Sequence, residues 1–106
     1  DGGRTMKYYA IMYDKQPAGN YKLFHEKLVA NPRIKRWFHY IQSSYLIGTD
    51  MTTQELSEHV CASFAASGLP TTHLAVKIDA RRRQGMLTPK AWDWFKLAST
   101  NQDPLG

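Results

Sequence analysis

The stretch Met6–Asp14, Met-Lys-Tyr-Tyr-Ala-Ile-Met-Tyr-Asp, is apolar and aromatic and is followed by the turn-prone sequence Lys-Gln-Pro-Ala-Gly. This pattern predicts a β-strand. Side chains alternate between the faces of a strand, and here both faces are apolar or aromatic. The faces are Tyr8, Ala10 and Met12 on one side and Tyr9, Ile11 and Tyr13 on the other. We therefore expect a central strand covered twice, by helices on one face and by a second copy of the chain or an extra C-terminal element on the other.

The segments that follow this strand carry clear start and stop signals. Asn20 is a good N-cap for an amphipathic helix that runs to about Ala30, where Asn31-Pro32 ends it. The β-prone region Arg33–Thr49 is too long for one strand, so we divide it near Gln42–Ser44 into two strands joined by a tight corner.

Three further elements are predicted in the second half. Thr52 and Glu55 form a capping box at the start of a helix that ends at Gly68 and Pro70. The residues His73–Asp79 alternate in polarity and predict a strand. Thr88-Pro89 then opens a short helix with an aromatic side. The element order predicts an α+β fold, the ferredoxin-like βαββαβ sandwich, with an appended C-terminal helix.

The length and composition set the wider expectations. The chain has 106 residues, a net charge of +5 and one cysteine. We expect one domain over residues 6–98, a cloning remnant over 1–5 and a flexible tail over 99–106. A single cysteine fits a reducing cytoplasm, and the apolar runs are too short to span a bilayer. The positive charge favours an acidic partner such as nucleic acid.

Asp14 is the candidate metal ligand. It stands where the first strand ends, and in a two-fold dimer it would meet its symmetry mate, giving the carboxylate oxygens that Mg²⁺ accepts. The alternative is an acid that caps a loop, as aspartate often does in turns.

Two basic clusters are the candidate nucleic-acid site. They are Arg33, Lys35 and Arg36, and Arg81, Arg82 and Arg83. Such clusters bind phosphates with little sequence preference, although solvated charge that prevents edge-to-edge strand pairing is an equal alternative. Aromatic residues on the strands could stack on bases, but in this density they more often form a core or a dimer interface.

The histidines and the cysteine give weaker signals. His25, His39, His59 and His73 show no metal-binding spacing, so we expect no zinc. His39 and His73 are the candidates for catalysis on the sheet surface, with a structural or exposed role as the favoured alternative. We expect Cys61 to be buried and unreactive.

Two stretches are similar to a known family. Lys7–Asp14, which ends in Tyr-Asp, resembles the first strand of the small dimeric CRISPR-associated adaptation protein, the Cas-two family. Gln42–Leu46 resembles that family's Gln-x-Ser-aliphatic-aromatic corner. Uncharacterised bacterial relatives with the same fold are nearer, because they share a Trp-rich ending like Leu87–Trp94. The resemblance implies a ferredoxin-like homodimer, and Asp14 matches the acid proposed to bind Mg²⁺ in members described as nucleases. It also implies a link to the virulence-associated D toxins, which cut RNA.

Three hypotheses about function follow, and whether the chain is an enzyme stays open. The first is a cytoplasmic, Cas-two-like homodimer that binds nucleic acid through the two basic clusters. The second is a Mg²⁺-dependent endoribonuclease that uses Asp14. The third is a protein-interaction module whose aromatic sheet face binds a partner chain.

Overall fold

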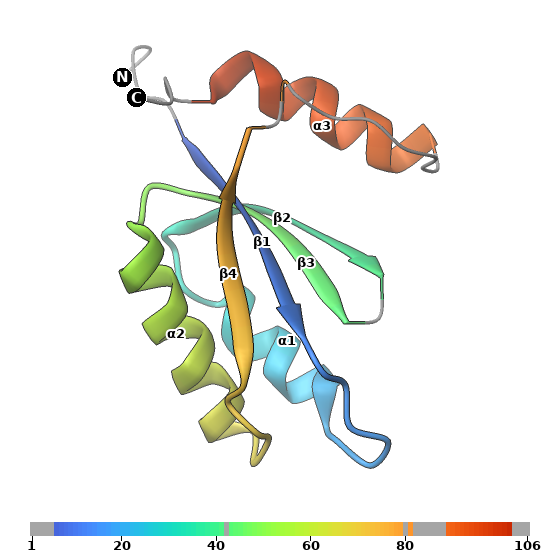
Figure 1. Ribbon diagram of the computed structural model, residues 1–106, viewed down its shortest axis with the longest axis vertical. Coiled ribbons are helices and arrows are strands. Elements are labelled where there is room, and N and C mark those ends of the chain that lie inside the picture. The colour runs from blue at the N-terminus through green and yellow to red at the C-terminus, as the bar shows by residue number, and fades with distance from the viewer. Residues whose placement is uncertain (1–5, 42, 80, 82–88, 103–106) are drawn as a thin grey trace.

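The computed structural model describes residues 6–41, 43–79, 81 and 89–102 (Figure 1). In these residues, four strands and three helices follow one another in the order β-α-β-β-α-β-α. Their bounds are β1 Lys7–Tyr13, α1 Tyr21–Val29, β2 Ile34–Ile41, β3 Ser44–Thr49, α2 Thr53–Ala66, β4 His73–Ile78 and α3 Pro89–Asn101. The fold is therefore mixed α+β, and the division of the long β-prone region into two strands is confirmed.

The four strands form one antiparallel sheet in the order β2-β3-β1-β4. The strand β1 is central, as predicted, because it pairs with β3 on one side and with β4 on the other. In this register Ile11 lies opposite Tyr45 on β3 and opposite Ala75 on β4. Since paired residues point to the same face, the register decides which side chains gather on each side of the sheet.

The caps of α1 and α2 are formed by the residues that the sequence indicates, while Thr88, predicted to cap α3, lies outside the described residues. The Asn20 side chain accepts a hydrogen bond from the backbone N–H of Leu23, at 3.2 Å, and begins α1. Thr52 and Glu55 form the complete capping box of α2. Gly68 follows α2 with a φ of 72°, a left-handed conformation that costs a glycine little.

The helices α1 and α2 together cover one face of the sheet (Figure 1). This face carries the main core, in which Tyr9, Ile11 and Tyr13 of β1 pack against both helices. The rings of Phe24 from α1 and Phe64 from α2 stack with centroids 4.0 Å apart and planes 4° apart. Because these rings and the β1 side chains exclude water, most of the hydrophobic stabilisation comes from this face.

The helix α3 covers part of the opposite face, at the end where β1 begins (Figure 1). Tyr8 is fully buried there with Ala98, and Trp94 meets the Tyr8 ring edge-on at 5.4 Å. The ring has room because Gly48 lies opposite it: a Cβ at this position would be 2.6 Å from the Tyr8 ring. An extra C-terminal element therefore provides part of the second cover that the sequence requires.

The last helix extends further than expected. A tail was predicted from residue 99, but α3 continues to Asn101 and Gln102 is buried. The Gln102 amide donates to the Asp79 carboxylate at 2.9 Å, which joins the end of α3 to the end of β4. Residues 103–106 lie outside the described residues, as do residues 1–5.

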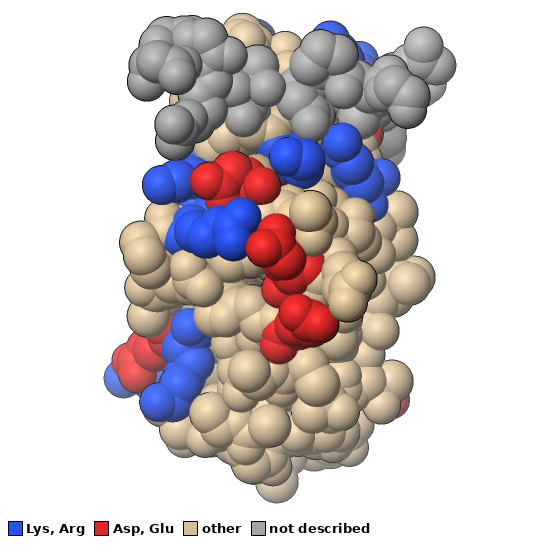
Figure 2. Space-filling view, turned by 90° about the vertical axis from the view of Figure 1, so that its left-hand side faces the viewer, with Lys and Arg blue, Asp and Glu red and all other residues tan. Residues whose placement is uncertain are grey.

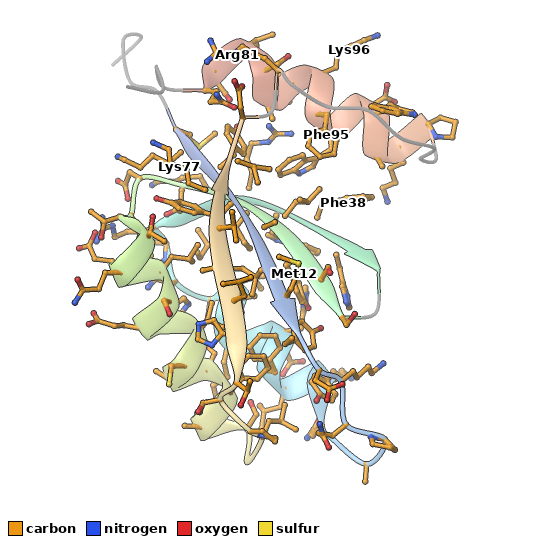
Figure 3. All side chains as sticks on the ribbon, in the orientation of Figure 1. Met12, Phe38, Lys77, Arg81, Phe95 and Lys96 are labelled. Carbon is orange, nitrogen blue, oxygen red and sulfur yellow. The ribbon has the colours of Figure 1, made fainter. Side chains whose placement is uncertain are left out.

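The remainder of the second face is apolar and exposed. Met12 of β1 and Leu74 and Val76 of β4 are 41%, 56% and 39% exposed, and we call these three residues the open sheet surface. In Figure 3, Met12 lies further along β1 than the part that α3 crosses. Within the described part of the chain, none of the helices has the length and apolar character to cross a membrane.

Candidate functional site

The candidate site is a pocket of about 420 Å³ between α1 and the strands β2 and β3. Its lining is aromatic and imidazole-rich, and we call it the aromatic–histidine pocket. The lining residues are Tyr21, Lys22 and His25 from α1, Trp37 and His39 from β2, and Tyr45 from β3. Pockets that combine apolar walls with a few convergent polar groups are the usual form of ligand sites.

Simple periodicity brings these residues together. Tyr21 and His25 are four residues apart, so they share one face of α1. Trp37 and His39 are two residues apart, so they share one face of β2. The helix crosses the sheet at this strand, and the two pairs meet around Tyr45.

Both imidazoles contact the Tyr45 side chain. The Nδ1 atom of His25 lies 2.8 Å from the Tyr45 hydroxyl, which is a hydrogen bond. The His39 ring stacks on the Tyr45 ring, with centroids 4.2 Å apart and planes 5° apart. His25 also meets the Trp37 ring edge-on at 4.6 Å. The two imidazoles are therefore both held against the same phenol.

The surroundings of His25 and Tyr45 favour the neutral forms of these two side chains. Burial lowers the pKa of His25 below its ordinary value, and the neighbouring His39 lowers it further, while Glu26 opposes both effects. Burial also raises the pKa of the Tyr45 phenol, and the neighbouring Tyr13 adds to the rise. At pH 7 His25 is thus a neutral imidazole, which can accept or donate a proton, and Tyr45 keeps its proton.

Two side chains that line this pocket are exposed to solvent. The Trp37 side chain is 43% exposed, and Lys22 is exposed on the first turn of α1. Large aromatic side chains usually bury most of their area, so a half-exposed tryptophan at a pocket is available for stacking. A lysine beside it supplies positive charge. The pocket can therefore receive a flat, anionic ligand.

The predicted metal ligand, Asp14, lies elsewhere. It is exposed at the end of β1 and lines a hollow of about 410 Å³ that also includes Met12, His73 and Leu74. The His73 ring is already bonded, because Nδ1 donates to the Thr71 carbonyl and Nε2 lies 2.7 Å from the Ser57 hydroxyl. His73 thus has a structural role.

The metal site predicted at Asp14 includes a second copy of the chain. Among residues 6–41, 43–79, 81 and 89–102, no three histidine, cysteine, aspartate or glutamate side chains come together as a metal site. The second carboxylate of the predicted site comes from the symmetry mate. Asp79 cannot supply the second carboxylate, because β4 runs antiparallel to β1. Asp79 therefore lies where β1 begins, and Asp14 lies where β1 ends.

The first basic cluster is divided between two surfaces. The Arg33 guanidinium pairs with Asp50 at 2.8 Å and with Glu55 at 3.2 Å. The contacts with Asp50 and Glu55 raise the pKa of Arg33, and Arg33 lowers the pKa of Asp50. The pKa of Glu55 is lowered first by its hydrogen bond from the Thr52 backbone N–H and then by Arg33. Lys35 is exposed and contributes to the lowered pKa of Asp50. The charge of this part of the cluster is therefore largely balanced by acids.

Arg36 points to the α3 side of the sheet. Its guanidinium donates to the Tyr8 hydroxyl at 3.0 Å and to the Trp94 backbone carbonyl at 3.3 Å. It also lies over the Trp94 ring, 4.7 Å from the centroid, and is partly buried. This geometry is a cation–π contact combined with two hydrogen bonds. Arg36 therefore fastens α3 to the sheet.

The second basic cluster is described only at Arg81, because Arg82 and Arg83 lie outside the described residues. Arg81 pairs with Asp79 at 3.3 Å, at the end of β4 (Figure 3). On the α2 side of the molecule, basic and acidic groups adjoin one another (Figure 2). This side does not present a field of one sign, which is the usual footprint of duplex binding.

Sequence reasoning missed the pairing of His25 with His39 because fourteen residues separate them. The signal was present in the two spacings, Tyr21 with His25 and Trp37 with His39, which place an aromatic ring beside each imidazole. Cys61 also differs from expectation, since it is half-buried rather than buried.

No protein-family model, curated protein or solved structure matches this chain.

Proposed function

We propose that the chain adopts the ferredoxin-like fold and binds single-stranded nucleic acid in the aromatic–histidine pocket. The fold assignment is supported by the antiparallel strand order β2-β3-β1-β4 combined with the element order βαββαβ, to which α3 is appended. The resemblance of Lys7–Asp14 to the Cas-two family points to the same fold.

The half-exposed Trp37 ring carries the binding proposal. Bases in a single strand expose their flat faces, and stacking on an aromatic side chain stabilises binding by about 1–3 kcal/mol per base. Lys22 stands in the same pocket and can meet the adjoining phosphate. The imidazoles of His25 and His39 add hydrogen-bonding groups for a base edge or a phosphate oxygen.

Among the described residues, Lys22 in this pocket is a better candidate for contact with a phosphate than the basic clusters first considered. Arg33 and Arg81 are paired with acids, and Arg36 is used to hold α3. In contrast, Lys22 lies beside a tryptophan and two histidines, which is a combination that recognises a nucleotide. Sequence-tolerant binding to single strands needs only such a stacking ring and a nearby cation.

Fluorescence anisotropy with a labelled single-stranded RNA and its DNA counterpart tests the proposal. We expect Trp37→Ala and Lys22→Ala to weaken binding at least fivefold. The matched control is Lys27→Ala, which removes the same charge from an exposed position of α1 outside the pocket. Equal affinity of all three variants and the wild type, or no binding at low salt, would reject the pocket.

The open sheet surface favours a second candidate function, the formation of a homodimer. Met12, Leu74 and Val76 expose apolar area on one side of the sheet, and such area is stabilised when a second copy covers it. Asp14 lines a hollow with Met12 and Leu74, so a two-fold contact there would bring two Asp14 carboxylates near one another.

Sedimentation equilibrium tests the dimer, and a nuclease assay tests the Mg²⁺-dependent alternative that depends on it. We expect Leu74→Asp to shift the protein toward monomer, because it would place a charge in the contact. RNA cleavage that needs Mg²⁺ and is lost in Asp14→Asn would support a shared metal site. A wild-type protein that is monomeric at high concentration argues against both.

A further inference from the structure

We propose that the aromatic–histidine pocket cleaves RNA without a metal, using His25 and His39 as a proton-transfer pair. The inference rests on the proposed binding of single-stranded nucleic acid in this pocket and adds a substrate class and a reaction. It is independent of Asp14, which lines a different hollow.

The arrangement of the two imidazoles is the first argument. One contacts the Tyr45 hydroxyl through Nδ1 at 2.8 Å and the other lies on the Tyr45 ring at 4.2 Å. Both imidazoles contact the same tyrosine and line the same pocket, so one phosphodiester bound there could meet the two of them. Such a bond is cleaved faster when one positioned group removes the proton from the attacking hydroxyl and a second donates a proton to the leaving oxygen.

The Tyr45 contact holds the His25 ring in place and is compatible with the tautomer that the reaction needs. When Nδ1 of His25 carries the proton and donates it to the Tyr45 oxygen, Nε2 keeps its lone pair. This tautomer is a base. Tyr45 is therefore a positioning residue, comparable to the partners that orient catalytic imidazoles in general.

Two other residues of the pocket can assist the reaction. Lys22 lines the pocket and can stabilise the charge that develops on the phosphate oxygens. Trp37 lies against the His25 ring at 4.6 Å, so a base stacked on this tryptophan would bring its own sugar and phosphate close to the imidazoles.

The reaction is a balanced transesterification. Nε2 of neutral His25 removes the proton from a ribose 2′-hydroxyl, and the 2′-oxygen forms a bond to the adjacent phosphorus. The bond from phosphorus to the 5′-oxygen breaks, and protonated His39 donates a proton to that oxygen. The products are a 2′,3′-cyclic phosphate and a 5′-hydroxyl. No water, metal or redox partner is consumed, and solvent restores the two protonation states.

The chemistry selects RNA, because the attacking group is the 2′-hydroxyl that DNA lacks. It also predicts a bell-shaped dependence of the cleavage rate on pH, since one imidazole must be neutral and the other protonated. The groups that face His25 and influence this profile are Glu26 and Lys22 on α1, His39 on β2 and Tyr45 on β3.

The test uses the full chain with a 5′-labelled single-stranded RNA in the presence of EDTA. We expect cleavage to products that end in a 2′,3′-cyclic phosphate, and no cleavage when the RNA is replaced by the same sequence of DNA. His25→Gln and His39→Gln should each slow cleavage by about 10²–10⁴-fold while binding falls little.

His59→Gln is the matched control. The His59 ring is bonded to the Leu28 backbone carbonyl outside the pocket, and glutamine can keep that bond. We expect it to cleave at the wild-type rate. Tyr45→Phe keeps the ring on which His39 stacks but removes the hydroxyl, so we expect it to shift the limb of the pH profile that reports His25.

The outcomes separate this inference from the proposed function. RNA that binds but stays intact at every pH from 5 to 9 overturns the cleavage and leaves binding in place. Cleavage that requires Mg²⁺, or that survives both histidine substitutions, also overturns it. If the wild type does not bind RNA, both the proposed function and the cleavage fail.

Discussion

The two faces of the sheet differ in how completely they are covered. On one face, α1 and α2 enclose a nearly water-free core in which Phe24 and Phe64 stack. On the other, α3 covers Tyr8 and its neighbours, while Leu74 and Met12 stay exposed. Both faces of β1 are equally apolar in sequence, so the difference comes from how much helix the chain has to place on each.

This contrast assigns different roles to the two faces. The enclosed face provides stability, and the candidate pocket lies at its border, where Trp37 reaches solvent. The partly covered face depends on a small number of contacts, and several of them involve Arg36. Substitutions should therefore have a large effect at the first face, an intermediate one where α3 binds, and almost none on the open sheet surface.

The largest effect is expected from Phe24→Ala. The side chain is fully buried and stacks on Phe64 at 4.0 Å, so its removal leaves a cavity between α1 and α2. We expect the free energy of unfolding to fall by about 3–5 kcal/mol, as for other buried phenylalanines. Urea denaturation followed by circular dichroism measures it. A loss below about 1 kcal/mol would show that this face is not the main core.

An intermediate effect is expected from Arg36→Met. Methionine keeps the apolar stem but removes the hydrogen bonds to Tyr8 and the Trp94 carbonyl, and the cation–π contact. We expect a loss of about 1–3 kcal/mol, because the buried Tyr8 hydroxyl also loses a partner. The same denaturation assay applies. Lys35→Met, at an exposed neighbouring position, is the control and should change stability by less than about 0.5 kcal/mol.

A smaller, pH-dependent effect is expected from His25. Its pKa is lowered in the folded protein, so below the unfolded value of about 6.5 the unfolded chain binds the proton more readily. Stability should therefore fall as the pH drops from 7.5 to 5.5, and His25→Gln should reduce this dependence. Thermal unfolding at both pH values measures it. The carboxyls with lowered pKa values, such as Asp50, act only at lower pH.

The smallest effect on stability is expected from Leu74→Thr. The side chain is 56% exposed on an edge strand, and threonine suits a strand, so unfolding should change by less than about 0.5 kcal/mol. The melting temperature at low protein concentration measures it. A clear loss of stability in this variant would mean that the open sheet surface is covered in solution, and the sharp contrast between the faces would then disappear.

Local signals explain why much of the fold could be predicted. Asn20 and Thr52 begin helices through hydrogen bonds to residues three positions away, and Gly68 ends one through its own backbone conformation. In β4, the alternation of apolar residues predicted the strand but did not show which of its faces is turned toward the helices. Its apolar residues Leu74 and Val76 point away from α2, because pairing with β1 turns His73 and Ala75 inward.

The candidate site could not be predicted as a unit, because it depends on contacts between distant segments. The His25–Tyr45 bond forms only when α1 lies against the sheet. Arg33 and Arg36 belong to one basic cluster of the sequence, but Arg33 precedes β2 and Arg36 lies within it, opposite Gly48. Arg33 pairs with acids, while Arg36 contacts Tyr8.

One contact at the start of β1 has a practical consequence. The Met6 amide donates to the Asn101 carbonyl at 2.9 Å, and Met6 bridges to Gln102. The Met6 amide hydrogen exchanges when this contact opens. Its exchange rate with deuterated water therefore reports opening of the contact between the start of β1 and the end of α3, and comparing it with amides in the middle of β1 would separate this local opening from unfolding of the whole molecule.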